Sequence, residues 1–307
     1  MFTLKDAEAL IAANLNKPKL TEVAVDEALP IAVAQLVAAK IAGDFTSGLI
    51  QADMEAYRKI PAISQSGLAR IARSPAHYIA YMNEQTEPTP AMIFGAAMHA
   101  AVFEAKEFAK RYAACPEGMR RDKRTKEYQE FLAANEGKTI LTQEEFAKID
   151  AIQASVGSHP EVSRILSAGA AEQAFLWKDP ETGLKCKGRA DWLRNDGVIV
   201  DLKTCEDASF EGFQRKSLVP SRIHVQAAFY TDAMRVIGMP SPGFIVIAVE
   251  KEPPYAVALY VLDDATIEKG RELYRRDLAV YAECLKTDKW PSYPEQIQTL
   301  NLPHYAW

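Results

Sequence analysis

The sequence has 307 residues, of which 48% are hydrophobic and 25% charged, and its formal net charge is −5. This composition is typical of a soluble globular protein. The acidic balance argues against a globally basic, histone-like DNA binder and leaves room for a local basic groove. No apolar run approaches the roughly 20 residues of a membrane helix. Asp6 and Glu8 lie in an N-terminal amphipathic pattern that differs from a secretory signal.

The four cysteines are scattered along the chain: Cys115, Cys186, Cys205 and Cys284 include no pair with Cys-x-x-Cys spacing. This spacing argues against a zinc site or an iron–sulfur cluster. Scattered cysteines without a secretory signal are typical of reduced thiols in the cytoplasm. We therefore expect a cytoplasmic protein that has no membrane association and no iron–sulfur cluster.

The first part of the chain is rich in Ala and Leu at helical spacing, and Pro18 and Pro30 divide it into short helices. We interpret residues 1–56 as an N-terminal helical extension. Residues 57–307 then form the main domain, which carries the remaining patterns.

The main domain begins with helical patterns and later changes to strands. Ser64 has the position of an N-cap residue, and Ser74-Pro75 ends one helix and starts another. The other expected elements are helices over 90–108, 124–137, 142–159 and 160–169, strands over 171–179, 183–195 and 198–204, helices over 208–217 and 221–238, strands over 243–252 and 255–264, and a final helix over 267–290. This order predicts a mixed α/β fold with one central mixed β-sheet flanked by helices.

The segment GRADWLRNDGVIVDLKT, residues 188–204, is typical of a β-hairpin closed by the turn signal Asn-Asp-Gly. If the loop has three residues, Arg194 pairs with Val198. Four charged side chains then share one face of the hairpin, because side chains alternate along a strand. These are Arg189, Asp191, Asp201 and Lys203, with the two aspartates opposed and the two cations opposed. A two-residue loop would shift the register by one and lose this arrangement.

Two directly opposed carboxylates repel each other, unless a divalent cation lies between them. A hard cation such as Mg²⁺ binds carboxylate oxygens and backbone carbonyls. Lys203 would face the same point, where it could orient or deprotonate a water or stabilise charge on a phosphate. The alternative is structural: Asp201 and Lys203 face solvent, and Asp191 pairs with Arg189. The hairpin alone does not decide between the two.

Five motifs in a common order resemble the PD-(D/E)XK nuclease superfamily. They are most similar to the group of the RecB-type nuclease domain, phage lambda exonuclease and the RecE exonuclease (exonuclease VIII). The group's pattern is a helical His, a strand Glu, G-x-x-D, D-x-K and a Q-x-x-x-Y helix. The matching residues are His99 in FGAAMHAAVFE, Glu172 in AEQAFLW, Gly188 to Asp191 in GRAD, Asp201 to Lys203 in DLK, and Gln226 to Tyr230 in QAAFY. ISQSGLARIARSPAHY and WPSYPEQIQTLNLP resemble the RecE-type branch, and the resemblance covers roughly residues 57–307.

This resemblance implies a metal-dependent catalytic site. The implied metal ligands are His99, Asp191, Asp201 and the backbone carbonyl of Leu202. The implied metal is Mg²⁺, for which Mn²⁺ can substitute. Glu172 and Lys203 are implied as further catalytic residues. Alone, His99 in its alanine-rich helix would more often be a core histidine, and Glu172 a surface acid. A sister family carries an iron–sulfur cluster on four cysteines that have no counterpart here.

The implied DNA contacts are Gln226, Tyr230, Ser64, Ser66, Arg70, Arg73 and Arg189. Gln226 and Tyr230 lie four residues apart on one helical face, where they either touch the DNA backbone or brace the site. The serines and the first two arginines surround a helix start, and helix N-termini and arginines bind phosphates well. The family recognises a DNA 5′ end nearby. The alternative is a simple helix cap with exposed arginines.

The resemblance further implies a bacterial or phage-encoded 5′-to-3′ exonuclease that acts on double-stranded DNA ends and leaves 3′ overhangs. Its implied partner is a RecT-like single-strand annealing protein, and its implied assembly is a ring-shaped homo-oligomer, with a tetramer favoured over a trimer. Candidate channel cations are residues 119–126, Lys185, Lys187, Arg189 and Arg215. Two alternatives stay open: a RecB-like nuclease of other polarity, and a non-catalytic subunit that binds DNA ends in a phage recombination complex.

Overall fold

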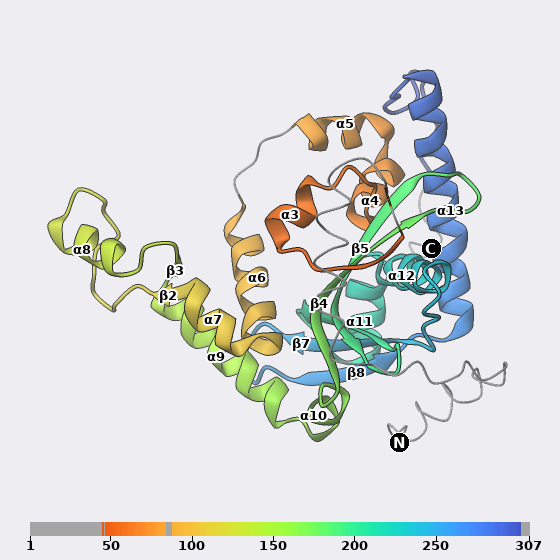
Figure 1. The fold of residues 1–307 in the computed structure, drawn as a ribbon. Coiled ribbons are helices and arrows are strands. Elements are labelled where there is room, and N and C mark those ends of the chain that lie inside the picture. The colour runs from red at the N-terminus through yellow and green to blue at the C-terminus, as the bar shows by residue number, and fades with distance from the viewer. Residues whose placement is uncertain (1–44, 46, 84–87, 302–307) are drawn as a thin grey trace.

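A six-stranded β-sheet forms the centre of the computed structural model, which describes residues 45, 47–83 and 88–301 (Figure 1). The strand order is β1-β4-β5-β6-β7-β8, and neighbours are antiparallel except for the parallel pair β6 and β7. The bounds are β1 Gly48–Ile50, β4 Gly169–Lys178, β5 Lys185–Arg194, β6 Ile199–Cys205, β7 Phe244–Glu250 and β8 Val257–Val261. The expectation of a central mixed sheet flanked by helices is confirmed.

Helices cover both faces of this sheet (Figure 1). The helices that share a core with one face are α4 Gln65–Arg73, α5 Pro75–Asn83, α12 Ile223–Val236 and α13 Asp264–Thr287. Those that share a core with the other face are α6 Pro90–Phe103, α9 Gln143–Ser158 and α10 Pro160–Ile165. Across the described part of the chain, no helix has both the length and the apolar character needed to cross a membrane.

Strand β7 shows why two cores form. Phe244, Val246 and Ala248 belong to the core on one face of the sheet. Ile245, Ile247 and Val249 belong to the core on the other face. Because successive side chains point to opposite faces, a strand that is covered on both sides must be apolar at every position. The run FIVIAV meets this requirement and therefore lies in the interior of the sheet.

The boundary expected at residue 56 is wrong for Gly48–Ile50. These residues form β1, which pairs antiparallel with β4 at the edge of the central sheet. Ile50 packs with Ala174 and Leu176 of β4, and partly buried residues of the following segment complete this small cluster. Pairing with β4 therefore overrides the helical pattern that precedes this segment. The helices expected over residues 1–44 lie outside the described residues.

A short arm, which we define as residues 112–141, stands away from the sheet (Figure 1). It consists of β2 (Tyr112–Ala114), a connection, α8 (Lys126–Ala134) and β3 (Thr139–Leu141), and its two strands pair in parallel with each other. The sequence patterns predicted α8 but neither strand. The helix expected over 90–108 is divided at Glu104 into α6 and α7 (Ala105–Arg111), and α7 leads directly into the arm.

Three short elements complete the described chain. Helix α3 (Met54–Lys59) follows β1 and packs near the β4–β5 pair. The helix expected over 208–217 consists of α11 (Phe210–Phe213) and the π-helical turn η1 (Gln214–Leu218). Both precede α12, and the whole segment connects the parallel strands β6 and β7, as a parallel pair requires.

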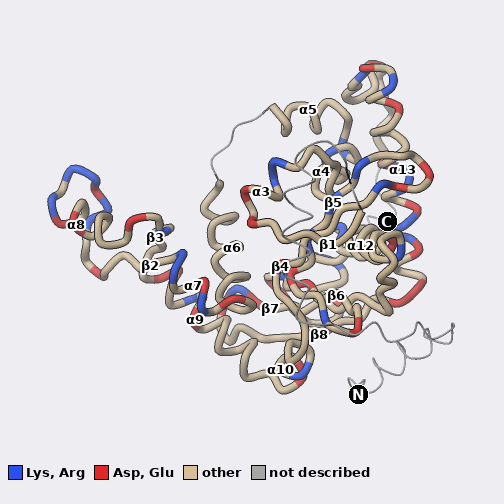
Figure 2. Tube along the Cα trace, in the orientation of Figure 1, with Lys and Arg blue, Asp and Glu red and all other residues tan. Residues whose placement is uncertain are grey.

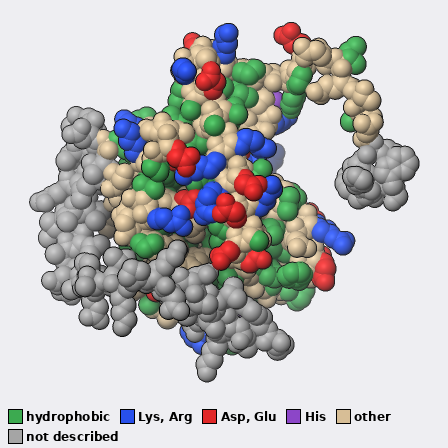
Figure 3. All heavy atoms as spheres, turned by 90° about the vertical axis from the view of Figure 1, so that its right-hand side faces the viewer, with side chains coloured by type: hydrophobic (Ala, Val, Ile, Leu, Met, Phe, Trp, Pro, Cys, Tyr) green, Lys and Arg blue, Asp and Glu red, His purple; other side chains and the backbone are tan. Residues whose placement is uncertain are grey.

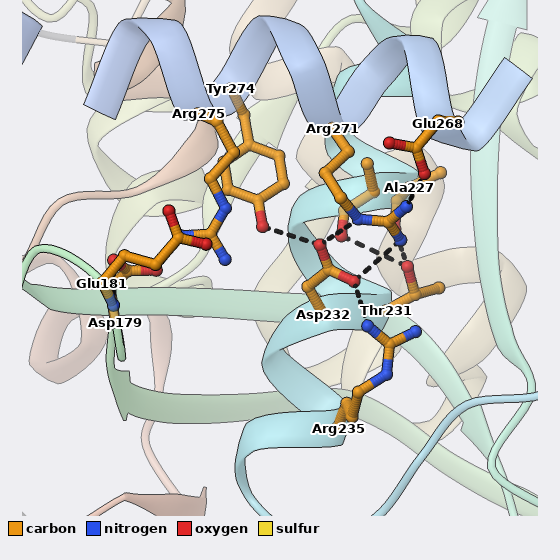
Figure 4. Close-up of polar contacts among 11 residues, drawn as sticks. Asp179, Glu181, Ala227, Thr231, Asp232, Arg235, Glu268, Arg271, Tyr274 and Arg275 are labelled. Carbon is orange, nitrogen blue, oxygen red and sulfur yellow. Dashed lines mark hydrogen bonds and ion pairs between the residues drawn. The ribbon is translucent and has the colours of Figure 1, made fainter. Parts of the chain in front are cut away.

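A buried acid, Asp232 of α12, holds α13 in place (Figure 4). Its carboxylate accepts hydrogen bonds from Arg271 Nε at 2.6 Å, from Arg271 Nη2 at 2.9 Å and from the Tyr274 hydroxyl at 2.7 Å. Burial alone would raise the pKa of Asp232, but these bonds lower it. The same helix reaches the end of β4, where Arg275 Nη1 donates to Asp179 at 2.6 Å. Helix α13 is therefore tied to α12 and to the sheet by buried carboxylates.

Replacing Asp232 with Ala would leave Arg271 and Tyr274 without their shared acceptor. We expect Asp232→Ala to lower the free energy of unfolding by about 3–5 kcal/mol, the range typical when one partner of a buried ion pair is removed. Urea denaturation at constant m-value would measure the loss. Glu283→Ala, at an exposed position of α13, is the control and should change the free energy by less than about 0.5 kcal/mol. Equal losses in the two variants would contradict this role of Asp232.

Candidate active site

The predicted hairpin forms with the predicted three-residue loop. The backbone N–H of Arg194 donates to the carbonyl of Val198 at 3.0 Å, and Gly197 supplies the left-handed φ of +86° in the loop. Two further pairs keep the register: Trp192 with Val200, and Leu193 with Ile199. The next positions in this register are Asp191 and Asp201. The pairing ends at Trp192 and Val200, so direct opposition of Asp191 and Asp201 stays a prediction, although the two carboxylates are close enough for their charges to interact.

Asp191 makes two contacts that link three elements. Its Oδ2 accepts a hydrogen bond from the backbone N–H of Leu202 at 2.8 Å, so a side chain on β5 meets the backbone of β6. The same oxygen lies 3.4 Å from Nδ1 of His99, which projects from α6. The structure thus brings His99 to the carboxylates, although the two lie far apart in the sequence.

Asp201 is the more deeply buried carboxylate, with only 2% of its side chain exposed. Its Oδ2 lies 2.6 Å from Nζ of Lys203, and its Oδ1 accepts a hydrogen bond from Nε2 of Gln226 at 2.7 Å. The Lys203 side chain is itself only 26% exposed. The structural alternative, in which Asp201 and Lys203 face solvent, is therefore wrong.

The cluster moves the pKa values of its two carboxyl groups apart. Burial raises the pKa of Asp201, and the Asp191 charge adds to this rise against the effect of Lys203. Burial acts on Asp191 in the same direction, but His99, Lys203 and the Leu202 N–H together lower the pKa of Asp191. The carboxylates also raise the pKa values of His99 and Lys203, although burial opposes both shifts. Acids with separated pKa values are typical of catalytic sites.

Glu172 and Arg189 form an ion pair beside the carboxylates. Arg189 Nε lies 2.9 Å from Glu172 Oε2 and donates to the Glu172 carbonyl at 3.3 Å, so Arg189 is not the partner of Asp191. Glu172 has a φ of +54°, a conformation that costs of order 1–3 kcal/mol for a residue other than glycine and that occurs often at functional sites. Burial raises the pKa of Glu172, and Arg189 opposes the shift. Arg189 Nη1 is buried, and no described residue accepts a hydrogen bond from it.

Gln226 and Tyr230 of α12 both face this site, as their four-residue spacing predicts. The Gln226 amide is used by Asp201. Tyr230 is 8% exposed, and its ring meets the ring of Phe175 edge to face at 5.1 Å. The structure therefore favours bracing of the site for both residues, and direct contact with DNA stays a prediction.

The helix start at Ser64 is present but lies apart from the carboxylates. Ser64 Oγ accepts a hydrogen bond from the Gly67 N–H at 3.3 Å and lies 2.9 Å from Ser66 Oγ. The preceding residue, Ile63, bridges to β5 at Cys186, about 17 Å along an extended strand from Asp191.

The arginines of the same helix have aromatic partners. The Arg70 guanidinium lies 5.2 Å from the centre of the Tyr81 ring, and Arg73 Nε donates to the Tyr293 hydroxyl at 3.3 Å. These contacts belong to the α4–α5 side of the molecule and not to the carboxylate cluster. DNA binding by the two serines and the two arginines stays a prediction.

Lys187 is not a channel cation, because it is only 8% exposed. Its ammonium donates to the carbonyls of Tyr57, Arg58 and Ile60 at 3.0, 3.1 and 2.8 Å, at the C-terminal end of α3. Burial lowers the pKa of Lys187 to about 8. Burial also raises the pKa of Tyr57, and the nearby Arg189 charge opposes this rise. Lys187 thus fastens α3 beside Arg189, and no pattern in the sequence predicted this contact.

No three His, Cys, Asp or Glu side chains within residues 45, 47–83 and 88–301 are arranged to hold one metal ion together. The donor set of the cluster nevertheless fits a hard divalent cation, because two carboxylates and an imidazole lie together. Burial and the Asp191 charge raise the pKa of Asp201, and a bound cation would relieve that effect. Ligation by His99, Asp191, Asp201 and the Leu202 carbonyl stays a prediction.

A family model described as "PDDEXK-like domain of unknown function (DUF3799)" matches residues 64–303, which is more than half of the chain. The chain belongs to this family. The PD-(D/E)XK superfamily that the five motifs predict is thereby confirmed. In this PDDEXK-like domain, Asp191, Asp201 and Lys203 occupy the hairpin that carries the D…D-x-K pattern. The RecE-type branch stays a prediction.

One solved structure supports the fold. The crystal structure of a protein named "Putative exonuclease" from Eubacterium rectale has a TM-score of 0.54 and 14% sequence identity, and the match covers 80% of this chain and 97% of that chain. At this identity the likeness shows a shared fold alone. The structure of SSO0001, with a TM-score of 0.31 and 13% identity over 82% of this chain and 86% of that chain, is too distant to support the fold. A search of curated proteins found no significant match.

Gly188, the first residue of GRAD, has a packing role that can be tested. A Cβ atom at this position would lie 2.3 Å from Phe175 Cε2 and 3.1 Å from Tyr230 Cε1. Because the Phe175 ring is wholly buried, we expect Gly188→Ala to lower the free energy of unfolding by about 1–3 kcal/mol through overpacking. The matched control is Gly95→Ala in α6, where a Cβ meets nothing within 4 Å. Thermal unfolding should separate the two variants, and an unchanged Gly188→Ala protein would show that the close approach is unimportant.

Proposed function

We propose that this protein is a divalent-metal-dependent exonuclease that hydrolyses phosphodiester bonds at the ends of double-stranded DNA. The observation that carries the proposal is the cluster in which β5, β6 and α6 bring together Asp191, Asp201, Lys203 and His99. Clustered carboxylates repel phosphate, so they offer little to a protein that only binds DNA. They suit metal-assisted hydrolysis.

The proposed metal is Mg²⁺, with Mn²⁺ as a substitute, and it would be held by His99, Asp191, Asp201 and the carbonyl of Leu202. When bound, such an ion makes water a better nucleophile at neutral pH and stabilises charge on the phosphate. The chain prepares the ligands for this task. The lowered pKa of Asp191 keeps its carboxylate ionised, and Gln226 holds Asp201 in one orientation.

Lys203 is proposed to meet the charge that develops on the phosphate. Although burial opposes the shift, Asp201 and Asp191 raise the pKa of Lys203, so the ammonium stays protonated at neutral pH. A protonated lysine can orient a water and offset negative charge, but it cannot accept a proton from that water. The raised pKa therefore favours electrostatic stabilisation over general-base catalysis by Lys203.

Arg189 is proposed as a second phosphate contact. Glu172 holds its Nε, while its buried Nη1 has no hydrogen-bond partner among the described residues. A buried guanidinium N–H without an acceptor costs free energy, and a phosphate oxygen would satisfy it with a charge-assisted hydrogen bond. Glu172 then acts mainly by holding Arg189, next to the carboxylates.

The finer features of the proposal rest on the RecE-type motifs. These features are 5′-to-3′ polarity, 3′ overhangs, cooperation with a RecT-like annealing protein in recombination, and a tetrameric ring. The net charge of −5 supports the ring, because an acidic protein has little general attraction for DNA. A closed symmetric assembly or a concentrated basic surface would keep it on its substrate.

The deciding experiment compares linear, nicked and covalently closed circular duplex DNA in the presence of Mg²⁺. The proposal expects degradation of linear DNA, no degradation of closed circles, and loss of activity in excess chelator. End-labelled linear duplexes with and without a 5′ phosphate report the polarity, and light scattering reports the oligomeric state. Full activity in chelator would overturn the metal-dependent mechanism. A monomer that degrades closed circles as fast as linear DNA would overturn the ring and the end preference.

The carboxylates should be required for cleavage but not for folding. Asp201→Asn keeps an oxygen acceptor for Gln226, removes the repulsion with Asp191, and deprives Lys203 of its ion pair. Because these effects oppose each other, we expect the free energy of unfolding to change by less than about 1–2 kcal/mol while cleavage is lost. Parallel denaturation and nuclease assays measure the two effects. An Asp201→Asn protein that cuts at the wild-type rate would contradict the proposed site.

Lys203→Ala should reduce turnover by about 10²–10³-fold, because the ammonium acts on charge that appears in the transition state. DNA affinity should change little, since one charge among many adds little to duplex binding. Single-turnover kinetics and equilibrium binding separate the two quantities. Lys251→Ala, at an exposed lysine beyond the end of β7, is the control and should retain full turnover. A loss in affinity alone would make Lys203 a binding residue and not a catalytic one.

A further inference from the structure

The most basic stretch of the chain lies on the arm. Residues 119–126 contain five Lys or Arg and one Asp, within a chain whose net charge is −5. Figure 2 shows these cations gathered on the connection that leads into α8, away from the central sheet. We propose that this connection, the arm tip, binds the phosphate backbone of duplex DNA outside the active site. The inference rests on the proposed nuclease function and adds a second DNA-binding surface to it.

The cations of the arm tip exceed the acids around them. Arg124 Nη2 lies 2.8 Å from Asp122 Oδ2, and Arg120 Nη2 lies 3.7 Å from the same oxygen, so two guanidinium groups share one carboxylate. Lys126 has a contact of 3.6 Å with Glu130. The three basic side chains are 79–88% exposed, and such surface ion pairs contribute little. Phosphate oxygens can therefore reach these cations and compete for them.

The arm tip is an ordered loop. Asp122 Oδ1 accepts hydrogen bonds from the backbone N–H and from Nε of Arg124, both at 3.0 Å. The Thr125 hydroxyl donates to the Asp122 carbonyl at 2.9 Å, and Gln129 Nε2 donates to the Lys123 carbonyl at 2.8 Å. These bonds set the path of the backbone, while Arg120, Lys123 and Lys126 stay at the surface. A preorganised loop loses less conformational entropy when it binds.

The base of the arm is also firmly packed. Phe108 of α7 stacks on Tyr112 of β2 with ring centres 5.2 Å apart, and it meets Phe146 of α9 at 5.4 Å. Arg121 Nη2 donates to the Ile140 carbonyl on β3 at 3.1 Å, which joins the arm tip to its stem. These contacts therefore fix the position of the arm tip relative to α7, α9 and β3.

The position of the arm decides which part of the DNA it can meet. Helix α6 carries His99 at the catalytic cluster, and α6 and α7 lead in turn to β2. In Figure 1 the arm extends from this side of the molecule, beyond α6 and away from the sheet. A duplex whose end lies at the carboxylates would therefore have to continue toward the arm tip to contact it. We infer that the arm tip contacts flanking duplex and not the scissile end.

The surface around α13 provides the comparison. Figure 3 shows this side of the molecule, where Lys and Arg alternate with Asp and Glu. Mixed charges of this kind give little net attraction for a polyanion. Lys269, Lys286 and Lys289 are exposed and lie in or just after α13. Figure 1 shows α13 on the side opposite the arm, so these lysines form a matched control set.

The test uses two triple variants of the full chain. The arm variant carries Arg120→Gln, Lys123→Gln and Lys126→Gln and keeps Arg121 and Arg124, which hold the loop. The control variant carries Lys269→Gln, Lys286→Gln and Lys289→Gln. Binding to blunt duplexes of about 10 and about 40 base pairs is measured in chelator between about 0.05 and 0.2 M salt, where each phosphate contact contributes about 0.9 to the slope of log K against log salt. Nuclease activity with Mg²⁺ is measured in parallel on the short duplex.

On the long duplex, the proposal expects the arm variant to show a slope of log K against log salt that is smaller in magnitude by about 2–3, and an affinity that is lower by at least about tenfold. On the short duplex it expects neither change. The control variant should match wild type, and short-duplex cleavage should be unchanged.

Equal behaviour of the two variants on the long duplex would overturn the proposal and leave the nuclease function intact. Equal losses on both duplexes would place the arm tip at the DNA end and overturn its assignment to flanking duplex. Unchanged DNA binding with a changed oligomeric state would make the arm tip a protein contact. Wild-type protein that neither binds nor cuts DNA would overturn both proposals.

Discussion

Two neighbouring carboxylates within the sheet, Asp191 and Asp201, are the constraint on which the rest of this structure depends. In isolation, Asp191 and Asp201 would repel each other and disfavour the hairpin that carries them. Lys203 lies 2.6 Å from Asp201, and His99 lies 3.4 Å from Asp191, so each acid has a basic partner. The cluster can therefore fold before a metal binds. The same partners keep Asp191 ionised and Lys203 protonated, which is the state that hydrolysis of a phosphodiester would need.

The surrounding elements hold this cluster from several sides. Helix α12 supplies the Gln226 amide to Asp201, and the buried acid Asp232 ties that helix to α13. On the other side of the site, Lys187 binds three carbonyls at the end of α3, next to Arg189. Each of these contacts joins a charged group to buried partners, so the loss of one partner would leave an unsatisfied charge. These contacts limit the freedom of the side chains at the proposed catalytic site, as preorganised electrostatic catalysis would require.

Local rules predicted the hairpin and the helix that braces it. Asn-Asp-Gly closes a three-residue loop, and the register of that loop brings Asp191 and Asp201 to positions just beyond the last paired residues, Trp192 and Val200. The spacing of Gln226 and Tyr230 places both on one face of α12 in the same way. The same kind of reasoning failed for Gly48–Ile50, because β1 exists only through its pairing with β4. It failed also for the short strands of the arm, which pair with each other across 24 intervening residues, 115–138.

The sequence by itself determined the fold class, the register of the hairpin and the identity of the central charges, because turn chemistry and periodicity act over a few residues. The tertiary structure alone decided which partners those charges have. Arg189 pairs with Glu172 and not with Asp191, and Lys187 is buried against α3 instead of facing DNA. The tertiary structure also separates the Ser64 helix start from the carboxylates and places the basic residues 119–126 on an arm. These outcomes depend on how distant segments pack, and no local pattern along the chain encodes that packing.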